Sequence, residues 1–163
     1  MSEALPLIRP AVEADLDAVR ALLRETWHQV YDPILGHDKV EEVTARWHAR
    51  DLLARQLHQA DATFLVACEG DVITAHGFAY VTEPGVLTVS RLYVRPGHQR
   101  RGIGQLLFKA LCAQHAEAAI LRLFVAAGNP AGLAFWRGQG FAVVREALEE
   151  GALVLHMEKH LRD

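Results

Sequence analysis

The chain has 163 residues, a length that suits one domain with a sizeable buried core. It is 51% hydrophobic and 23% charged, with a formal net charge of -3, which gives no support to a general nucleic-acid or membrane-surface binder. Its two cysteines, Cys68 and Cys112, lie far apart and form neither a disulfide framework nor a metal-type cluster. Because the first residues lack a secretory-signal pattern and no apolar run could span a bilayer, we expect a reducing, cytoplasmic setting.

The first third of the chain is expected to be mostly helical. Residues 5–9 predict a short strand, and Asp15 is the expected N-cap of a helix over 16–27, which has Leu16, Val19 and Leu23 on one face. Residues 31–36 read Tyr-Asp-Pro-Ile-Leu-Gly and predict a loop. A second helix is expected over 38–59, with a kink near Asp51.

From residue 62 the hydrophobic period changes to that of strands. Three strands over 62–67, 72–81 and 86–94 are joined by short turns, which predicts an antiparallel meander. A strongly apolar-faced helix begins near Ile103, and the next strand, over 120–125, should pair in parallel because a helix connects the two. Asn129 and Pro130 open a short helix that ends at 138–140, and 141–145 with 153–159 form a closing hairpin. We therefore expect one α/β domain over residues 1–163, around a mixed sheet.

The segment 92–107 combines a strand, a basic loop with glycines and the first turn of a helix. Helix starts present free amide N–H groups, and the helix dipole also favours an anion there. Gly102 and Gly104 allow a ligand to approach the backbone closely, while Arg100 and Arg101 add charge. The pattern predicts a polyphosphate site. A Walker A loop is excluded because Gly-Lys-Ser/Thr is absent, and the dinucleotide fingerprint fails because Leu107 stands where its third glycine belongs.

Residues 99–104, Gln-Arg-Arg-Gly-Ile-Gly, resemble the Gln/Arg-x-x-Gly-x-Gly/Ala signature of the GNAT superfamily, the GCN5-related N-acetyltransferases. Residues 92–96 look like the splayed fourth strand of that family. Residues 129–141 are similar to its later Asn-x-x-Ala-x-x-Phe-Tyr-x-x-x-Gly-Phe segment, and 155–159 to its last strand. The resemblance covers nearly the whole chain. It implies a single GNAT-like domain with a mixed, mostly antiparallel sheet of about six to seven strands and about four flanking helices.

The resemblance implies that acetyl-CoA, or another acyl-CoA, is the co-substrate, with no metal. Backbone groups of Leu92 and Val94 would pair with the pantetheine arm, and the Val94 N–H would stabilise the oxyanion of the tetrahedral intermediate. The implied donor-binding residues are Leu92, Tyr93, Val94, Gln99, Arg100, Arg101, Gly102, Ile103, Gly104, Gln105, Asn129, Phe135 and Trp136.

The implied reaction is acetyl transfer to a primary amine of a small molecule or peptide, by direct attack in a ternary complex. Trp136 stands where many members of the family carry a tyrosine acid, and the fourth and fifth strands lack the glutamate that some members use as a base. The acid–base candidates are therefore Glu83, His76 and Tyr31. Each has a competing structural role: Glu83 could lie in a solvated turn, His76 could be a core residue, and Tyr31 could line the acceptor pocket. For Tyr93, a packing role is favoured over an acid–base role.

Two rival hypotheses stay open. The tryptophan at position 136 and the missing carboxylates also suit a catalytically degenerate CoA-binding sensor or interaction module. Nucleic-acid binding through the basic loop is the least favoured hypothesis, because the net charge of the chain is negative. The nine histidines show no spacing that demands a metal; His156 and His160 are four apart, but at the expected end of a strand. Residues 27–57 should shape the acceptor pocket, but their mixed chemistry does not identify the amine. The resemblance also suggests a homodimer.

Overall fold

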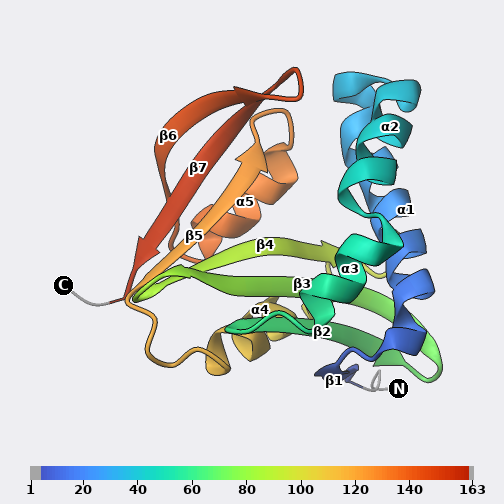
Figure 1. Cartoon of the computed structure of the whole chain (residues 1–163). Coiled ribbons are helices and arrows are strands. Elements are labelled where there is room, and N and C mark those ends of the chain that lie inside the picture. The colour runs from blue at the N-terminus through green and yellow to red at the C-terminus, as the bar shows by residue number, and fades with distance from the viewer. Residues whose placement is uncertain (1–4, 162–163) are drawn as a thin grey trace.

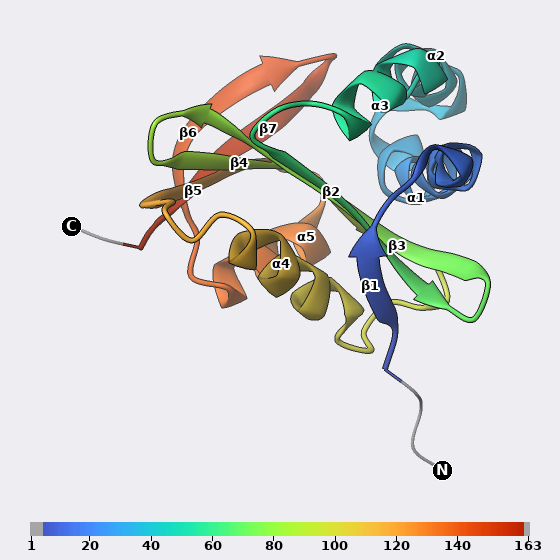
Figure 2. The same cartoon turned by 60° about the horizontal axis from the view of Figure 1, so that its bottom comes forward.

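The computed structural model describes residues 5–161. Within that range seven strands form one mixed sheet in the order β1-β2-β3-β4-β5-β7-β6. Helices α1, α2 and α3 lie on one face of the sheet and α4 and α5 on the other (Figures 1 and 2). The elements are β1 (Leu7–Pro10), a 3-10 turn (Glu13–Asp15), α1 (Leu16–Leu35), α2 (His37–Trp47), α3 (Arg50–Leu57), β2 (Ala62–Glu69), β3 (Val72–Glu83), β4 (Val86–Val94), α4 (Ile103–Ala113), β5 (Ile120–Ala126), α5 (Pro130–Gly138), β6 (Ala142–Glu149) and β7 (Ala152–His160).

The sheet divides at the junction between β4 and β5. The predicted meander and parallel crossover are confirmed, because β1 to β4 pair antiparallel and β4 pairs in parallel with β5. That parallel pairing covers only 86–89 of β4, opposite 120–123 of β5. Past Val89, β4 stays paired with β3 while β5 diverges with β7 and β6, which Figure 1 shows as a fork.

A β-bulge marks the point at which the fork opens. Arg91 pairs with Phe78 on β3 and Val89 pairs with Ala79, so Ser90 has no partner of its own on that strand. An extra residue of this kind bends its strand and increases the local twist. The bulge therefore turns the second half of β4 away from β5.

Each face of the sheet carries its own hydrophobic core. Leu107 and Leu111 of α4 pack on one face, and Leu16, Leu23 and Leu53 of α1 and α3 pack on the other. The α4 face depends on Gly77 of β3, because a Cβ there would lie 2.8 Å from Cδ1 of Leu111. The absent side chain lets α4 approach the sheet closely.

Two predictions for the first third of the chain are wrong. The predicted loop at 31–36 is helical as far as Leu35, with Pro33 inside α1, and the helix ends at Gly36, whose φ is +89°. Proline weakens a helix interior, but Trp27, six residues before Pro33, is buried against Val40 and Val43 of α2, and this packing outweighs the local signal. The predicted single helix over 38–59 is two helices, α2 and α3.

Asp15 is the N-cap residue of α1, as predicted, but its side chain makes no capping hydrogen bond to the helix. Its carboxylate instead accepts hydrogen bonds from the Val12 N–H at 2.8 Å and from both terminal nitrogens of Arg9 at 2.7 and 3.0 Å. The side chain is only 11% exposed, so these bonds tie β1 to the chain that enters α1.

We expect Asp15→Asn to lower the free energy of unfolding by about 1–3 kcal/mol at neutral pH, because it removes a nearly buried charged acceptor. The Arg9 hydrogen bonds hold the pKa of Asp15 below its ordinary value. Its stabilisation is therefore complete above the unfolded-state pKa of about 3.9 and is lost as the pH falls through the lower folded-state pKa. Urea denaturation across this acid range should show the difference from wild type shrinking. Asp17→Asn, an exposed neighbour paired with Arg50, should change stability much less, and an equal loss would contradict the assignment.

Candidate functional site

A cleft of about 950 Å³ occupies the fork between β4 and β5. Its walls come from the inner face of α1, the free half of β4, the 99–105 segment, β5 and the first turns of α5. Neighbouring strands in a sheet lie about 4.8 Å apart, so a split between two strands leaves room for an extended chain. The cleft thus lies where a strand-like ligand would fill the gap in the sheet.

The β4 wall presents backbone groups to the cleft. Arg95 donates its N–H to the Thr74 carbonyl of β3 at 2.8 Å, and Tyr93 and Arg91 pair with His76 and Phe78 in the same register. Backbone groups alternate in direction along a strand, so the amides of Leu92 and Val94 face away from β3, into the cleft. The wall can therefore hydrogen-bond an extended ligand as a neighbouring strand would.

The loop between β4 and α4 adopts left-handed backbone at Gly97, Arg100 and Gly102, with φ values of +93°, +65° and +80°. Such conformations make successive amide N–H groups converge, which forms a concavity that suits anions. Gly102 is also the N-cap of α4, so the free amides of the first helical turn and the positive end of the helix dipole lie beside the same loop.

The loop and the first turn of α4 are fixed by close contacts. Gln99 donates from Nε2 to the Val94 carbonyl at 3.0 Å and to Oε1 of Gln29 on α1 at 3.1 Å. A Cβ on Gly104 would lie 3.4 Å from the Phe135 ring and 3.7 Å from the Val94 side chain. Any larger side chain at position 104 must therefore project into the cleft.

Most residues of the predicted donor site line the cleft, and two do not. Arg101 lies 3.3 Å from Glu69 and 3.2 Å from His98 through its terminal nitrogens, outside the described lining. Ile103 is 2% exposed and belongs to the core, so only its backbone can face a ligand. The residues that do line the cleft are Leu92, Tyr93, Val94, Gln99, Arg100, Gly102, Gly104, Gln105, Asn129, Phe135 and Trp136.

The α5 wall begins with the predicted cap. Asn129 accepts a hydrogen bond from the Gly132 N–H at 3.1 Å, which fixes the start of α5 at the cleft. Trp136 is only 9% exposed and packs edge-on against Phe108 and Phe141, with ring centroids 5.2 and 5.3 Å apart. Its indole contributes mainly to the core beneath the cleft.

The structure places His76 and Glu83 away from the cleft; neither belongs to its described lining. His76 is fully buried on the α1 side of the sheet, with Nδ1 2.9 Å from the Leu65 carbonyl and Nε2 accepting from Nε of Arg91 at 3.0 Å. Burial lowers the pKa of His76 well below its ordinary value, so the imidazole is neutral. Glu83 lies at the end of β3, 3.7 Å from Arg122.

Tyr31 does line the cleft, where its ring stacks on Trp27 with centroids 4.2 Å apart. Burial raises the pKa of Tyr31 above its ordinary value, so the phenol is neutral and can donate a hydrogen bond but cannot act as a base near pH 7. Tyr93 is also partly buried, and burial raises its pKa. Within the described part of the chain, the ionisable groups of the lining are these two phenols and Arg100, without a carboxylate or imidazole.

Sequence reasoning assigned residues 27–57 and Tyr31 to the acceptor wall but did not single out Gln29 or Pro33, and it missed the contribution of β5. Gln29 and Pro33 of α1 line the cleft because the helix continues through the proline, and Phe124 of β5 lines it with 46% of its surface exposed. The sequence carries no signal for Phe124, because a phenylalanine within an apolar strand segment looks like a core residue. Gly128 completes this wall, since a Cβ there would lie 2.8 Å from Ile34 of α1.

The fold matches that of known acetyltransferases. Residues 16–141 match the model of the acetyltransferase (GNAT) family, and the chain belongs to that family. The PaiA N-acetyltransferase of Thermoplasma acidophilum, solved with coenzyme A, is 22% identical and superposes with a TM-score of 0.85 over 98% of this chain and 99% of that one. The ribosomal-protein-alanine N-acetyltransferase of Brucella melitensis is 24% identical, with a TM-score of 0.75 over 95% and 99%.

YncA of Salmonella typhimurium, solved with its cofactor acetyl-CoA, is 20% identical, with a TM-score of 0.70 over 98% of this chain and 96% of that one. A search of curated protein sequences finds no match. No helix within residues 5–161 has the length and apolar character needed to cross a bilayer.

Proposed function

We propose that the chain is an acyl-CoA-dependent N-acyltransferase that transfers acetyl from acetyl-CoA to a primary amine of a small molecule or peptide. The observation that carries this proposal is the fork between β4 and β5, which has an anion-binding loop at its open end and inward-facing strand amides along its wall. A pyrophosphate fits the first feature and an extended pantetheine arm fits the second. The complexes of two structural neighbours with coenzyme A and acetyl-CoA support this choice of donor.

The direction of β4 supports a particular position for the thioester of the donor. Val94 lies at the phosphate end, beside Gly104 at the start of α4, whereas the strand runs inward from there through Leu92 to the bulge at Ser90. A donor whose pyrophosphate sits at the α4 N-terminus therefore places its thioester deeper than Val94. We accordingly assign the oxyanion contact that the sequence suggests for Val94 to the amide of Leu92, which faces the same cleft.

The described lining suggests how the amine is deprotonated. Because it offers no carboxylate or imidazole, we infer that the amine attacks as its free base, having lost its proton to solvent. After attack, the nitrogen loses its second proton to solvent as the tetrahedral intermediate collapses to the amide. The coenzyme A thiolate can leave unprotonated, since a thiol has a modest pKa, near 8.5. Tyr31 supplies a hydrogen-bond donor and an aromatic wall for the acceptor rather than a base.

The pH dependence of kcat/KM tests this inference. With an alkylamine acceptor of pKa about 10, kcat/KM should rise about tenfold per pH unit from pH 6.5 to 8.5, because only the free base reacts. Fixed-time assays of released thiol at saturating acetyl-CoA give kcat/KM for the amine at each pH. A plateau that begins between pH 6 and 7 would instead reveal an imidazole or perturbed carboxylate base and would overturn the free-base inference.

An acceptor panel tests the function itself. Polyamines, aminoglycosides, amino acids and peptides with free N-termini are offered with acetyl-CoA, and released thiol and acetylated product are measured by absorbance and mass spectrometry. We expect at least one amine to gain a single acetyl group at a rate above thioester hydrolysis. Tight acetyl-CoA binding without turnover on any amine would favour the sensor or interaction module, whose supporting observation is the lack of an ionisable base in the described lining.

A further inference from the structure

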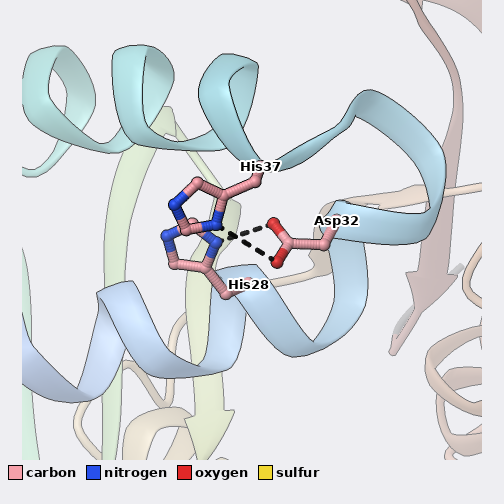
Figure 3. Close-up of side chains that lie close together, drawn as sticks. All are labelled: His28, Asp32 and His37. Atoms are coloured by element: carbon pink, nitrogen blue, oxygen red, sulfur yellow. Dashed lines mark hydrogen bonds and ion pairs between the residues drawn. The ribbon is translucent and has the colours of Figure 1, made fainter.

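Four ionisable side chains meet where α1 turns into α2, on the side of α1 away from the cleft. His28 and Asp32 are one turn apart on α1, and His37 and Glu41 are one turn apart on α2. Figure 3 shows His28, Asp32 and His37 converging from the two helices across the turn at Gly36. The proposed acyl transfer uses none of these side chains.

Three of these groups are spaced as metal ligands. Nδ1 of His28 lies 2.6 Å from Oδ1 of Asp32, and Nδ1 of His37 lies 3.7 Å from Oδ2 of the same carboxylate. One ligand atom from each of the three residues lies within 4.8 Å of the other two. Two imidazole nitrogens and one carboxylate are a donor set that zinc and related divalent ions prefer.

A second carboxylate lies behind both imidazoles. Nε2 of His28 is 2.7 Å from Oε1 of Glu41, and Nε2 of His37 is 3.9 Å from the same oxygen. Glu41 is in turn held by Arg24, whose Nη2 and Nε lie 2.6 and 3.0 Å from that oxygen. Histidines that bind metals typically donate their other ring N–H to a carboxylate, which orients the ring and strengthens the ligand. The contacts of Glu41 with the imidazoles involve other atoms than the three possible ligand atoms, and they also indicate a metal site.

We propose that Nδ1 of His28, the Asp32 carboxylate and Nδ1 of His37 bind one divalent transition-metal ion of the zinc type. The two rings stack with centroids 4.6 Å apart and planes 26° apart, so both Nδ1 atoms lie at the Asp32 end of the stack. The His37 side chain is 65% exposed, which leaves its ring free to turn its lone pair onto the ion. Binding releases the proton shared by His28 and Asp32, and water fills the remaining position of a tetrahedral ion.

The ion would join two helices that otherwise meet across a glycine. It would fix the start of α2 to the last turns of α1, and the opposite side of those turns lines the cleft through Gln29 and Pro33. The bound ion would therefore hold one wall of the cleft in position without contacting the donor. Its role would be to stabilise the junction between α1 and α2.

Zinc titration of the chelator-treated full chain tests the proposal. Isothermal calorimetry with ZnCl2 should show one ion per chain, and His37→Ala should weaken binding at least about tenfold. His58→Ala is the matched control, because His58 is equally exposed and also lies 3.1 Å from a carboxylate, that of Glu13, but has no second histidine beside it in the described structure. Its zinc affinity should equal that of wild type.

Cobalt provides a spectroscopic readout that needs no activity. Co2+ in a tetrahedral site with two imidazoles should give a visible absorption band in wild type and in His58→Ala, and the band should be lost in His37→Ala. Zinc should also raise the melting temperature of wild type but not of His37→Ala. No zinc binding by the wild type, or equal weakening by His37→Ala and His58→Ala, would overturn the proposal. Neither readout depends on whether the acyl transfer proposed above is correct.

Discussion

Gly104→Trp should abolish acetyl-CoA binding and leave the fold intact. A Cβ at this position already touches Phe135 and Val94, so the indole must enter the cleft, where the donor pyrophosphate and the start of its arm would lie. We expect the dissociation constant measured by calorimetry to rise at least about a hundredfold, which corresponds to about 2.7 kcal/mol. Circular dichroism and thermal melting should stay close to those of the wild type, because the indole projects into the cleft rather than into the core.

Two variants serve as controls for this test. Gly104→Ala adds a Cβ at ordinary contact distance and should retain most of the affinity. Gly138→Trp places the same indole at the end of α5, where a Cβ meets nothing within 4 Å, and should bind acetyl-CoA normally. Wild-type affinity in Gly104→Trp would mean that the donor does not occupy the fork.

His76→Leu should destabilise the protein by about 3–5 kcal/mol, because it leaves the buried charge of Arg91 without its acceptor. Arg91 is 7% exposed, its guanidinium stacks 4.8 Å from the Phe78 ring centroid, and its described hydrogen bond runs from Nε to His76. Burial lowers the pKa of Arg91 to about 10, which still leaves it protonated near pH 7. Equilibrium urea unfolding, with the slope m checked for each variant, gives the free energies.

A double variant separates the two contributions. His76→Leu with Arg91→Met removes donor and acceptor together and replaces them with apolar groups of similar volume, so most of the lost stability should return. The same cycle tests catalysis: because His76 lies outside the described cleft lining, kcat/KM per folded molecule should not change in the double variant. A single His76→Leu variant as stable as the wild type, or a double variant less stable than the single, would contradict this account of the pair.

The sequence predicted the fold well where the signal is local. The meander, the crossover and α4 follow from hydrophobic period and turn residues, and the loop that precedes α4 follows from Gly102. The fork follows from the family resemblance alone, because strands that pair and strands that diverge have the same hydrophobic period, and the bulge at Ser90 depends on its neighbour in space. Arg100 and Arg101 are adjacent and chemically alike, and only the left-handed backbone at Arg100 separates the one at the cleft from the one at Glu69.

Long-range packing accounts for the other differences. Pro33 indicates a break, yet the helix continues, and that continuation brings Gln29 and Pro33 to the cleft. His28 and His37 are nine residues apart and meet only because the chain reverses at Gly36, so their spacing did not indicate a metal site. The cytoplasmic setting, the homodimer and the transfer to a primary amine stay predictions.

The short junction between β4 and β5 also affects the lifetime of the chain. Within residues 5–161, four residue pairs join the two halves of the sheet, and a donor lying along β4 would act as an additional strand between them. Such a ligand binds the folded state alone, so its concentration enters the folding equilibrium: at a hundred times its dissociation constant it adds about 2.7 kcal/mol. Unfolded molecules then become about a hundredfold rarer, and cleavage by proteases that act on them should slow in proportion to donor supply.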